Sequence, residues 1–168
     1  NDDASASTTV TGNAAFSGTT ITIGETALDT FNAGSLTVTS AGAVIVSENS
    51  ATNLSGLSTA GSLTLTSTGA ITDDAAASTT VTGNANLSGT SITLGDTGTD
   101  LFNAGSLTIN SAGAVAITED SASDLTGTNT AASLSLSATG AVTDTSASTT
   151  VTGNASFSGT SITLGDQA

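Results

Sequence analysis

The 168-residue chain contains no lysine, arginine or histidine, and its 14 Asp and Glu residues give it a formal net charge of −14. Proteins bind nucleic acid largely through Lys and Arg contacts to phosphate, and this chain has none to offer. The sequence therefore excludes a nucleic-acid partner. Membrane insertion is not expected either, since the longest apolar run, near AGAVIV at 41–46, falls far short of the roughly 18 to 20 residues that span a bilayer.

Cysteine, proline, methionine, tryptophan and tyrosine are also absent, and aromatic residues make up only 2% of the chain. Without cysteine there are no disulfides and no thiolate metal ligands. Serine is abundant, but no histidine or lysine is present to activate it as a nucleophile. Polysaccharide lyase chemistry is not expected either, because these enzymes need a basic residue beside the substrate and the chain has no Lys, Arg or His. The sequence therefore predicts a protein that is not an enzyme, with a core of aliphatic and small residues.

One eighteen-residue stretch occurs three times. STTVTGNAAFSGTTITIG at 7–24 returns as STTVTGNANLSGTSITLG at 78–95 and as STTVTGNASFSGTSITLG at 148–165. Val10, Val81 and Val151 mark a period of 71 and then 70 residues. We expect 1–168 to be a single solenoid segment of a longer repetitive protein, with large repeats at 1–71 and 72–142 and a partial repeat at 143–168.

A shorter unit lies inside the large repeat. AGSLTVTSAGAVIV at 33–46 and AGSLTLTSTGAI at 60–71 alternate apolar with polar residues and break at glycines such as Gly42 and Gly69. Such alternation predicts short strands separated by tight corners, and a period of 20 to 50 residues is typical of solenoids. We predict an all-β, right-handed parallel β-helix of about seven coils of roughly 23 residues, three per large repeat. One inward column would contain Leu36, Leu63, Leu107 and Leu134, with Ala14, Ala85 and Ala155 in the alternate coils.

The acidic residues follow the inward apolar positions by two to four residues in every unit, which predicts a ridge of carboxylates along one corner of the solenoid. With no Lys or Arg to offset their repulsion, the ridge is either solvated and screened by salt or bound to hard divalent cations, of which Ca²⁺ best tolerates irregular oxygen ligands. The chain requires no cofactor on this view, and calcium is the one candidate. The candidate metal ligands are Glu25, Asp29, Glu48, Asp73, Asp74, Asp96, Asp100, Glu119, Asp120, Asp144 and Asp166.

The units GSLTVTSAGAVIV (34–46) and GSLTLTSTGAITDD (61–74) resemble repeats of filamentous-haemagglutinin-like exoproteins and other giant surface adhesins of Gram-negative bacteria. This resemblance implies a right-handed parallel β-helix, export to the cell surface, and a role as stalk, filament or adhesin. We therefore expect the non-catalytic shaft of an extracellular filament, sheath or adhesin. Its partners would be other copies or flanking repeats of the same protein, and a host or neighbouring-cell surface.

Two alternative functions remain open. One is a calcium-dependent surface-binding module built on the carboxylate ridge. The other is an ice-binding solenoid, which would present a regular threonine lattice on one face. The segments LTVT at 36–39 and LTLT at 63–66 fit such a lattice, but the matching outward positions elsewhere are occupied by Ala15, Asn86 and Ser135. Threonine also favours strands for its β-branched shape alone.

Overall fold

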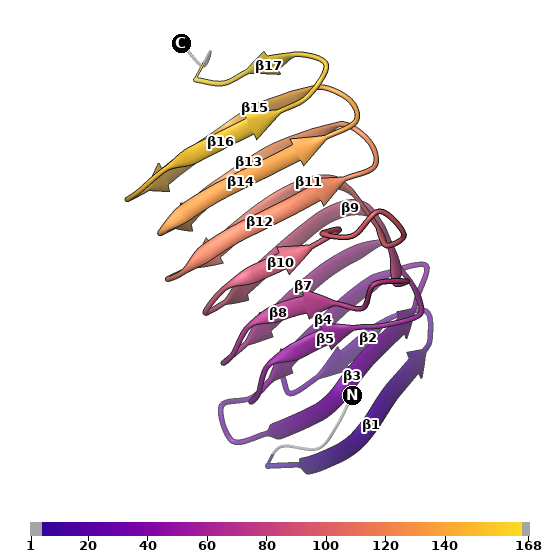
Figure 1. Ribbon diagram of the computed structural model, residues 1–168. Coiled ribbons are helices and arrows are strands. Elements are labelled where there is room, and N and C mark those ends of the chain that lie inside the picture. Colours follow the sequence, from indigo (N-terminus) through magenta and orange to yellow (C-terminus); the bar gives the residue numbers. More distant parts are fainter. Residues whose placement is uncertain (1–4, 166–168) are drawn as a thin grey trace.

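The computed structural model describes residues 5–165, and within them all regular structure is β-strand. Seventeen strands follow one another with short connections, and the first strand and the last lie at opposite ends of the stack (Figure 1). The strands are β1 (Ser7–Ser17), β2 (Ile21–Ile23), β3 (Thr30–Thr39), β4 (Ala43–Glu48), β5 (Thr52–Leu54), β6 (Leu57–Ala60), β7 (Ser62–Ser67), β8 (Ile71–Asp73), β9 (Ser78–Gly89), β10 (Ile92–Leu94), β11 (Leu101–Ser111), β12 (Ala114–Glu119), β13 (Ser123–Ala131), β14 (Ser133–Ala138), β15 (Val142–Val151), β16 (Ala155–Ser158) and β17 (Ile162–Thr163).

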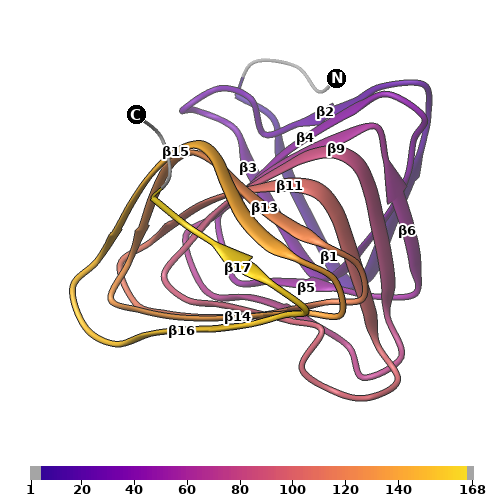
Figure 2. The same ribbon diagram turned by 90° about the horizontal axis from the view of Figure 1, so that it is seen from above.

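Each strand pairs in parallel with the strand that lies one coil further along the chain, for example β2 with β4 and β12 with β14. The advance from one coil to the next ranges from 18 residues, between Leu36 and Leu54, to 23, between Ile21 and Val44. Viewed from above, the coils follow a roughly three-sided outline (Figure 2). The predicted parallel β-helix of about seven coils is confirmed, with coils of about 21 residues.

The core follows from the two-residue period of the strands. In β3 the side chains of Leu36 and Val38 are buried, whereas Thr39 points outward and is exposed. The interior consists mainly of stacked Leu, Ile, Val and Ala side chains, with Phe31 and Phe102 also fully buried, because each coil presents the same inward positions to its neighbours. Corners are correspondingly tight: a Cβ on Gly42 would lie 2.4 Å from the carbonyl oxygen of Thr19. This contact explains why glycine stands at that break.

The stacking differs from the predicted column at one point in each large repeat. Leu63 lies on Val44, and Leu36 lies beneath Leu54, so Leu36 and Leu63 do not pair. The segment between them contains β5 and β6, which form parts of an additional coil. Both strands are short and largely polar, which is why the alternation did not reveal them. The prediction of three coils per large repeat is therefore wrong.

One large repeat spans about three and a half coils, so successive copies of the eighteen-residue stretch lie on different sides of the solenoid. Ala14 and Ala85 occupy the same position in successive copies, but they belong to separate stacks. Ala155, in the third copy, returns to the strands that lie above Ala14. The first stack runs through Ala14, Leu36, Leu54 and Asp73, and the second through Ile21, Val44, Leu63 and Ala85. Thr52 lies on β5, the same strand as Leu54, and the series above it runs through Ile71, Ile92, Val115 and Leu134 to Ala155 in the third copy.

No helix within residues 5–165 has the length and apolar character needed to cross a membrane.

Candidate functional site

The acidic residues do not form one continuous ridge. Glu48 lies beneath Ser67 and Glu119 beneath Ala138, so the next coil has no carboxylate at either place. The ridge prediction assumed that equivalent residues of successive units stack on one another, and the half-coil offset between large repeats prevents this. The carboxylates instead form short groups on different sides of the solenoid. Asp166, the last member of the predicted ridge, lies outside the described residues.

Two of the predicted ligands are buried hydrogen-bond acceptors for backbone amides. Glu48 is 2% exposed and Glu119 is fully buried. Oε1 of Glu48 accepts a hydrogen bond from the amide of Ala33 at 2.7 Å, and Oε1 of Glu119 accepts one from the amide of Ala104 at 2.8 Å. Both amides lie within a strand, directly before the register shift in its pairing with the preceding coil. Both glutamates therefore join adjacent coils.

The second oxygen distinguishes the two glutamates. Oε2 of Glu48 accepts a hydrogen bond from the hydroxyl of Thr52 at 2.7 Å, whereas Oε2 of Glu119 is buried without a partner. Burial raises the pKa of Glu119 to about 7, and the nearby hydroxyl of Ser123 offsets part of the rise without making a hydrogen bond of normal geometry. Glu119 is therefore partly protonated near neutral pH.

Several other predicted ligands also serve as acceptors between coils. Oδ2 of Asp120 accepts from the amide of Phe102 at 3.2 Å, and Oδ1 of Asp74 accepts from the side-chain amide of Asn53 at 2.7 Å. Both oxygens of Asp144 accept from the amide of Gly165, at 3.1 and 3.0 Å. These contacts use the carboxylates to hold neighbouring coils together.

Asp124 belongs to the same group of acceptors and was absent from the predicted ridge. Its Oδ1 accepts from the hydroxyl of Thr143 at 2.7 Å and from the amide of Thr145 at 2.9 Å. Asp124 stands where Asn53 stands in the preceding large repeat. That exchange of Asn for Asp between copies was the signal in the sequence that could have identified it.

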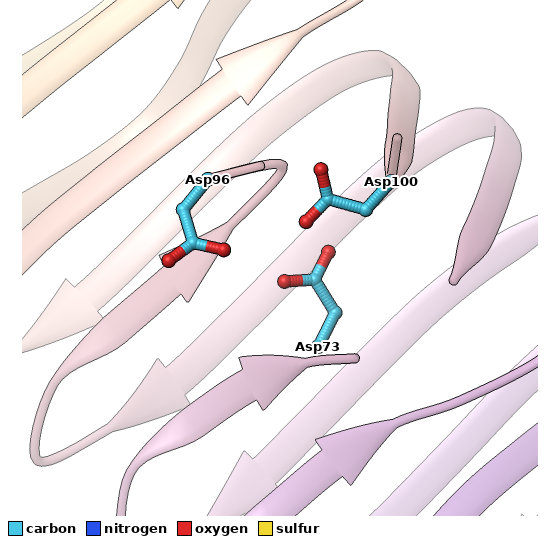
Figure 3. Close-up of side chains that lie close together, drawn as sticks. All are labelled: Asp73, Asp96 and Asp100. Atoms are coloured by element: carbon cyan, nitrogen blue, oxygen red, sulfur yellow. The ribbon is translucent and has the colours of Figure 1, made fainter. Parts of the chain in front are cut away.

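Three of the predicted ligands meet in one place. Asp73 ends β8, Asp96 follows β10 in the next coil, and Asp100 immediately precedes β11. One carboxylate oxygen from each lies within 4.8 Å of the others, and the three side chains point toward a common centre (Figure 3). Within residues 5–165 this is the one group of three acidic side chains with such spacing. We call Asp73, Asp96 and Asp100 the aspartate cluster.

The three members of the aspartate cluster differ in burial. Asp100 is 3% exposed, Asp73 is half-buried and Asp96 is exposed. Oδ2 of Asp73 accepts from the amide of Gly95 at 3.0 Å, and Oδ1 of Asp100 accepts from the amide of Thr97 at 3.0 Å. The remaining oxygens, Oδ1 of Asp73 and Oδ2 of Asp100, are buried without hydrogen-bond partners.

The electrostatics of the cluster follow from this arrangement. Burial, together with the negative charges of Asp100 and Asp96, raises the pKa of Asp73 to about 6. Desolvation and like charges both disfavour ionisation of a carboxyl group. The cluster therefore concentrates negative charge that nothing in the chain neutralises, because the sequence contains no Lys, Arg or His.

The equivalent loop of the first large repeat has a different hydrogen-bond pattern. Asp29 occupies the position of Asp100, and Glu25 that of Asp96. Oδ1 of Asp29 accepts from the amide of Ala6 at 3.0 Å and Oδ2 from the amide of Thr26 at 2.9 Å. The hydrogen bond from Thr26 lowers the pKa of Asp29 from its ordinary value. Both oxygens of this buried aspartate are thus satisfied by backbone amides.

The chain belongs to a family of repeat proteins. The family model described as repeats of unknown function (DUF5649) matches residues 41–110 and again residues 112–168. The two matches begin 71 residues apart, which agrees with the large period of the sequence. No curated protein and no solved structure matches the chain.

Proposed function

We propose that this chain is a length of the shaft of an extracellular filament, sheath or adhesin, and that it has no catalytic role. The observation that carries the proposal is the stacking itself. Three copies of one stretch are built into a uniform parallel stack, and their half-coil offset places them alternately on different sides of the rod. Such an arrangement extends a rod by repetition.

The chemistry of the surface supports the same proposal. A catalytic site needs a general base, nucleophile or electrophile at a defined position, and the chain offers carboxylates and hydroxyls without a basic residue to activate them. The absence of Lys and Arg also removes every trypsin site, which suits a protein exposed to secreted proteases. The resemblance to filamentous-haemagglutinin-like repeats supports a place at the cell surface.

The partners proposed for this shaft are flanking repeats and other copies of the same protein. Parallel strands at either end of a β-solenoid leave backbone amide and carbonyl groups that another coil can pair with. Further repeats of the same family continue the stack without a change of register. Contact with a host or neighbouring cell would then occur along the sides of the rod or at a separate tip.

Electron microscopy of the full-length native protein tests the proposal. We expect thin fibres in which the repeat along the axis is about 34 Å, since seven coils about 4.8 Å apart bring equivalent copies back to the same side. A single large repeat would advance about 17 Å and alternate between sides. Compact, dispersed particles from the native protein would contradict the proposed shaft.

Ice binding receives less support from the surface. One outward column runs through Thr22, Ile45, Thr64 and Asn86, so threonine does not occupy every coil. Ice-binding faces need a regular threonine lattice, which this column does not provide. A thermal-hysteresis assay with ice-shaping would show activity if the alternative were correct.

A further inference from the structure

We propose that the aspartate cluster is a binding site for one hard divalent cation, with a preference for Ca²⁺, and that the bound ion fastens two neighbouring coils together. The proposal differs from a metal-binding ridge, because it assigns the ion to Asp73, Asp96 and Asp100 alone. It is also independent of the proposed function, since a solenoid can serve as a shaft with or without the ion.

The first observation is the geometry of the three carboxylates. Oxygens within 4.8 Å of one another can be bridged by one ion whose metal–oxygen distances are about 2.3–2.6 Å, the range typical of Ca²⁺. Mg²⁺ requires shorter distances of about 2.0–2.1 Å and near-octahedral geometry. The exposed side of Asp96 leaves room for water molecules to complete the six to eight oxygen ligands that Ca²⁺ usually takes.

The second observation is the unpartnered oxygen of a buried side chain. Asp100 is 3% exposed, its carboxylate points toward the other two (Figure 3), and its Oδ2 has no hydrogen-bond partner. Oδ1 of Asp73 is likewise buried without a hydrogen-bond partner. A buried polar atom without a partner is costly, and a bound cation removes that cost for both oxygens at once.

The chain itself cannot neutralise the cluster. No Lys, Arg or His exists anywhere in the sequence, so no side chain of the chain can form an ion pair with the cluster. In the first large repeat, the amide of Ala6 satisfies Asp29. The corresponding amide of the second repeat, that of Ala77, donates instead to the carbonyl oxygen of Asp74 at 2.8 Å. Because the amide of Ala77 is used in this turn at 74–77, Asp100 does not receive the hydrogen bond that the amide of Ala6 gives to Asp29.

The position of the cluster indicates what a bound ion would do. Asp73 belongs to one coil, whereas Asp96 and Asp100 belong to the next, and the two coils are paired through Ile71 and Ile92. An ion held by all three aspartates therefore crosses the boundary between coils. We expect it to stabilise this part of the stack against separation of the coils.

Isothermal titration calorimetry with Ca²⁺, at fixed ionic strength, tests the site directly. We expect a saturable Ca²⁺ isotherm for the whole chain that loses one site per chain in Asp100→Asn, and weaker binding of Mg²⁺. Asp96→Asn is a second variant, chosen because an exposed side chain can be changed without disturbing the fold, and it should weaken Ca²⁺ binding at least about tenfold. Asp124→Asn is the matched control, since it removes one charge outside the cluster and should leave the site intact.

The outcomes separate a specific site from simple screening. Loss of the site in Asp100→Asn and Asp96→Asn but not in Asp124→Asn supports the proposal. Absence of saturable binding overturns it, as does an isotherm equally strong in Asp96→Asn and wild type. Equal melting temperatures in millimolar Ca²⁺, Mg²⁺ and chelator at one ionic strength would likewise overturn it.

Discussion

The two complete large repeats place nearly the same residues in different surroundings. Glu48 in the first repeat accepts hydrogen bonds from the amide of Ala33, the hydroxyl of Ser50 and the hydroxyl of Thr52. Glu119 in the second repeat keeps the amide contact but has a buried oxygen without a partner. Two neighbouring positions differ between the repeats: Ser123 stands where Thr52 stands, and Ser121, the counterpart of Ser50, donates to the carbonyl oxygen of Ala122 at 3.2 Å.

The acidic loops of the two repeats differ in the same direction. Asp29 has both oxygens bonded to amides, whereas Asp100 has one oxygen bonded and one without a partner. A repeat can therefore keep its fold while the hydrogen-bond partners of its buried carboxylates change. The second repeat leaves these charges to be neutralised by a proton at Glu119 and, in our proposal, by a cation at Asp100.

Removing Glu48 should have the largest effect. Glu48→Ala leaves the amide of Ala33 and the buried hydroxyl of Thr52 without an acceptor, so the free energy of unfolding should fall by about 2–4 kcal/mol. Glu119→Ala should cost less, about 1–2 kcal/mol, because fewer donors lose a partner. Urea unfolding followed by circular dichroism measures both, since the chain has no Trp or Tyr. Equal losses for the two variants would contradict the comparison.

The pH dependence of stability should identify Glu119. Its pKa is raised from 4.5 to about 7 in the folded chain, so between these values the folded chain holds a proton that the unfolded chain has released. The free energy of unfolding therefore falls as the pH rises through this window, by at most roughly 3 kcal/mol. Glu119→Gln removes this contribution. The two proteins should be similarly stable near pH 4.5 and should diverge, with Glu119→Gln the more stable, toward pH 7; a difference that stays constant across the window would contradict the assignment.

Restoring the missing methyl group should have the smallest effect on stability. The added methyl group of Ser123→Thr restricts χ1 and should hold the hydroxyl in the orientation from which Thr52 donates to Glu48, so we expect a gain of about 1 kcal/mol and a lower pKa of Glu119. The reverse change, Thr52→Ser, should lose a similar amount. Urea unfolding near pH 7 measures both variants. Loss of stability in Ser123→Thr would show that the two sites differ by more than this hydroxyl.

The sequence predicted where the strands lie better than it predicted which strands pair with one another. Alternation at 36–39 and 44–46 and the glycine breaks identified the inward Leu and Val side chains correctly, because a two-residue period depends only on local sequence. The pairing of coils depends on how many residues each coil uses. The segment between Leu36 and Leu63 hides an extra passage through β5 and β6, and this passage changed every later stacking partner.

The same limitation applied to the acidic residues. The sequence placed Asp73, Asp96 and Asp100 on a continuous ridge with Glu25 and seven others, whereas the structure brings these three together in one cluster. Which carboxylates meet depends on which coils are adjacent, and that is a property of the stack as a whole. Burial of Glu48 and Glu119 was also unexpected, because no local pattern shows that a backbone amide of the neighbouring coil requires their oxygens.

Cysteine cross-linking tests most directly the central claim that a large repeat spans about three and a half coils. The native chain has no cysteine, so pairs can be introduced freely. Ile45 is the stacking partner of Thr64, at a spacing of about 4.8 Å that a disulfide can bridge. We expect Ile45→Cys with Thr64→Cys to form an intramolecular disulfide under mild oxidation, whereas Thr37→Cys with Thr64→Cys should not. Cross-linking of the Thr37 pair without the Ile45 pair would place Leu63 above Leu36, restore three coils per repeat and contradict the account.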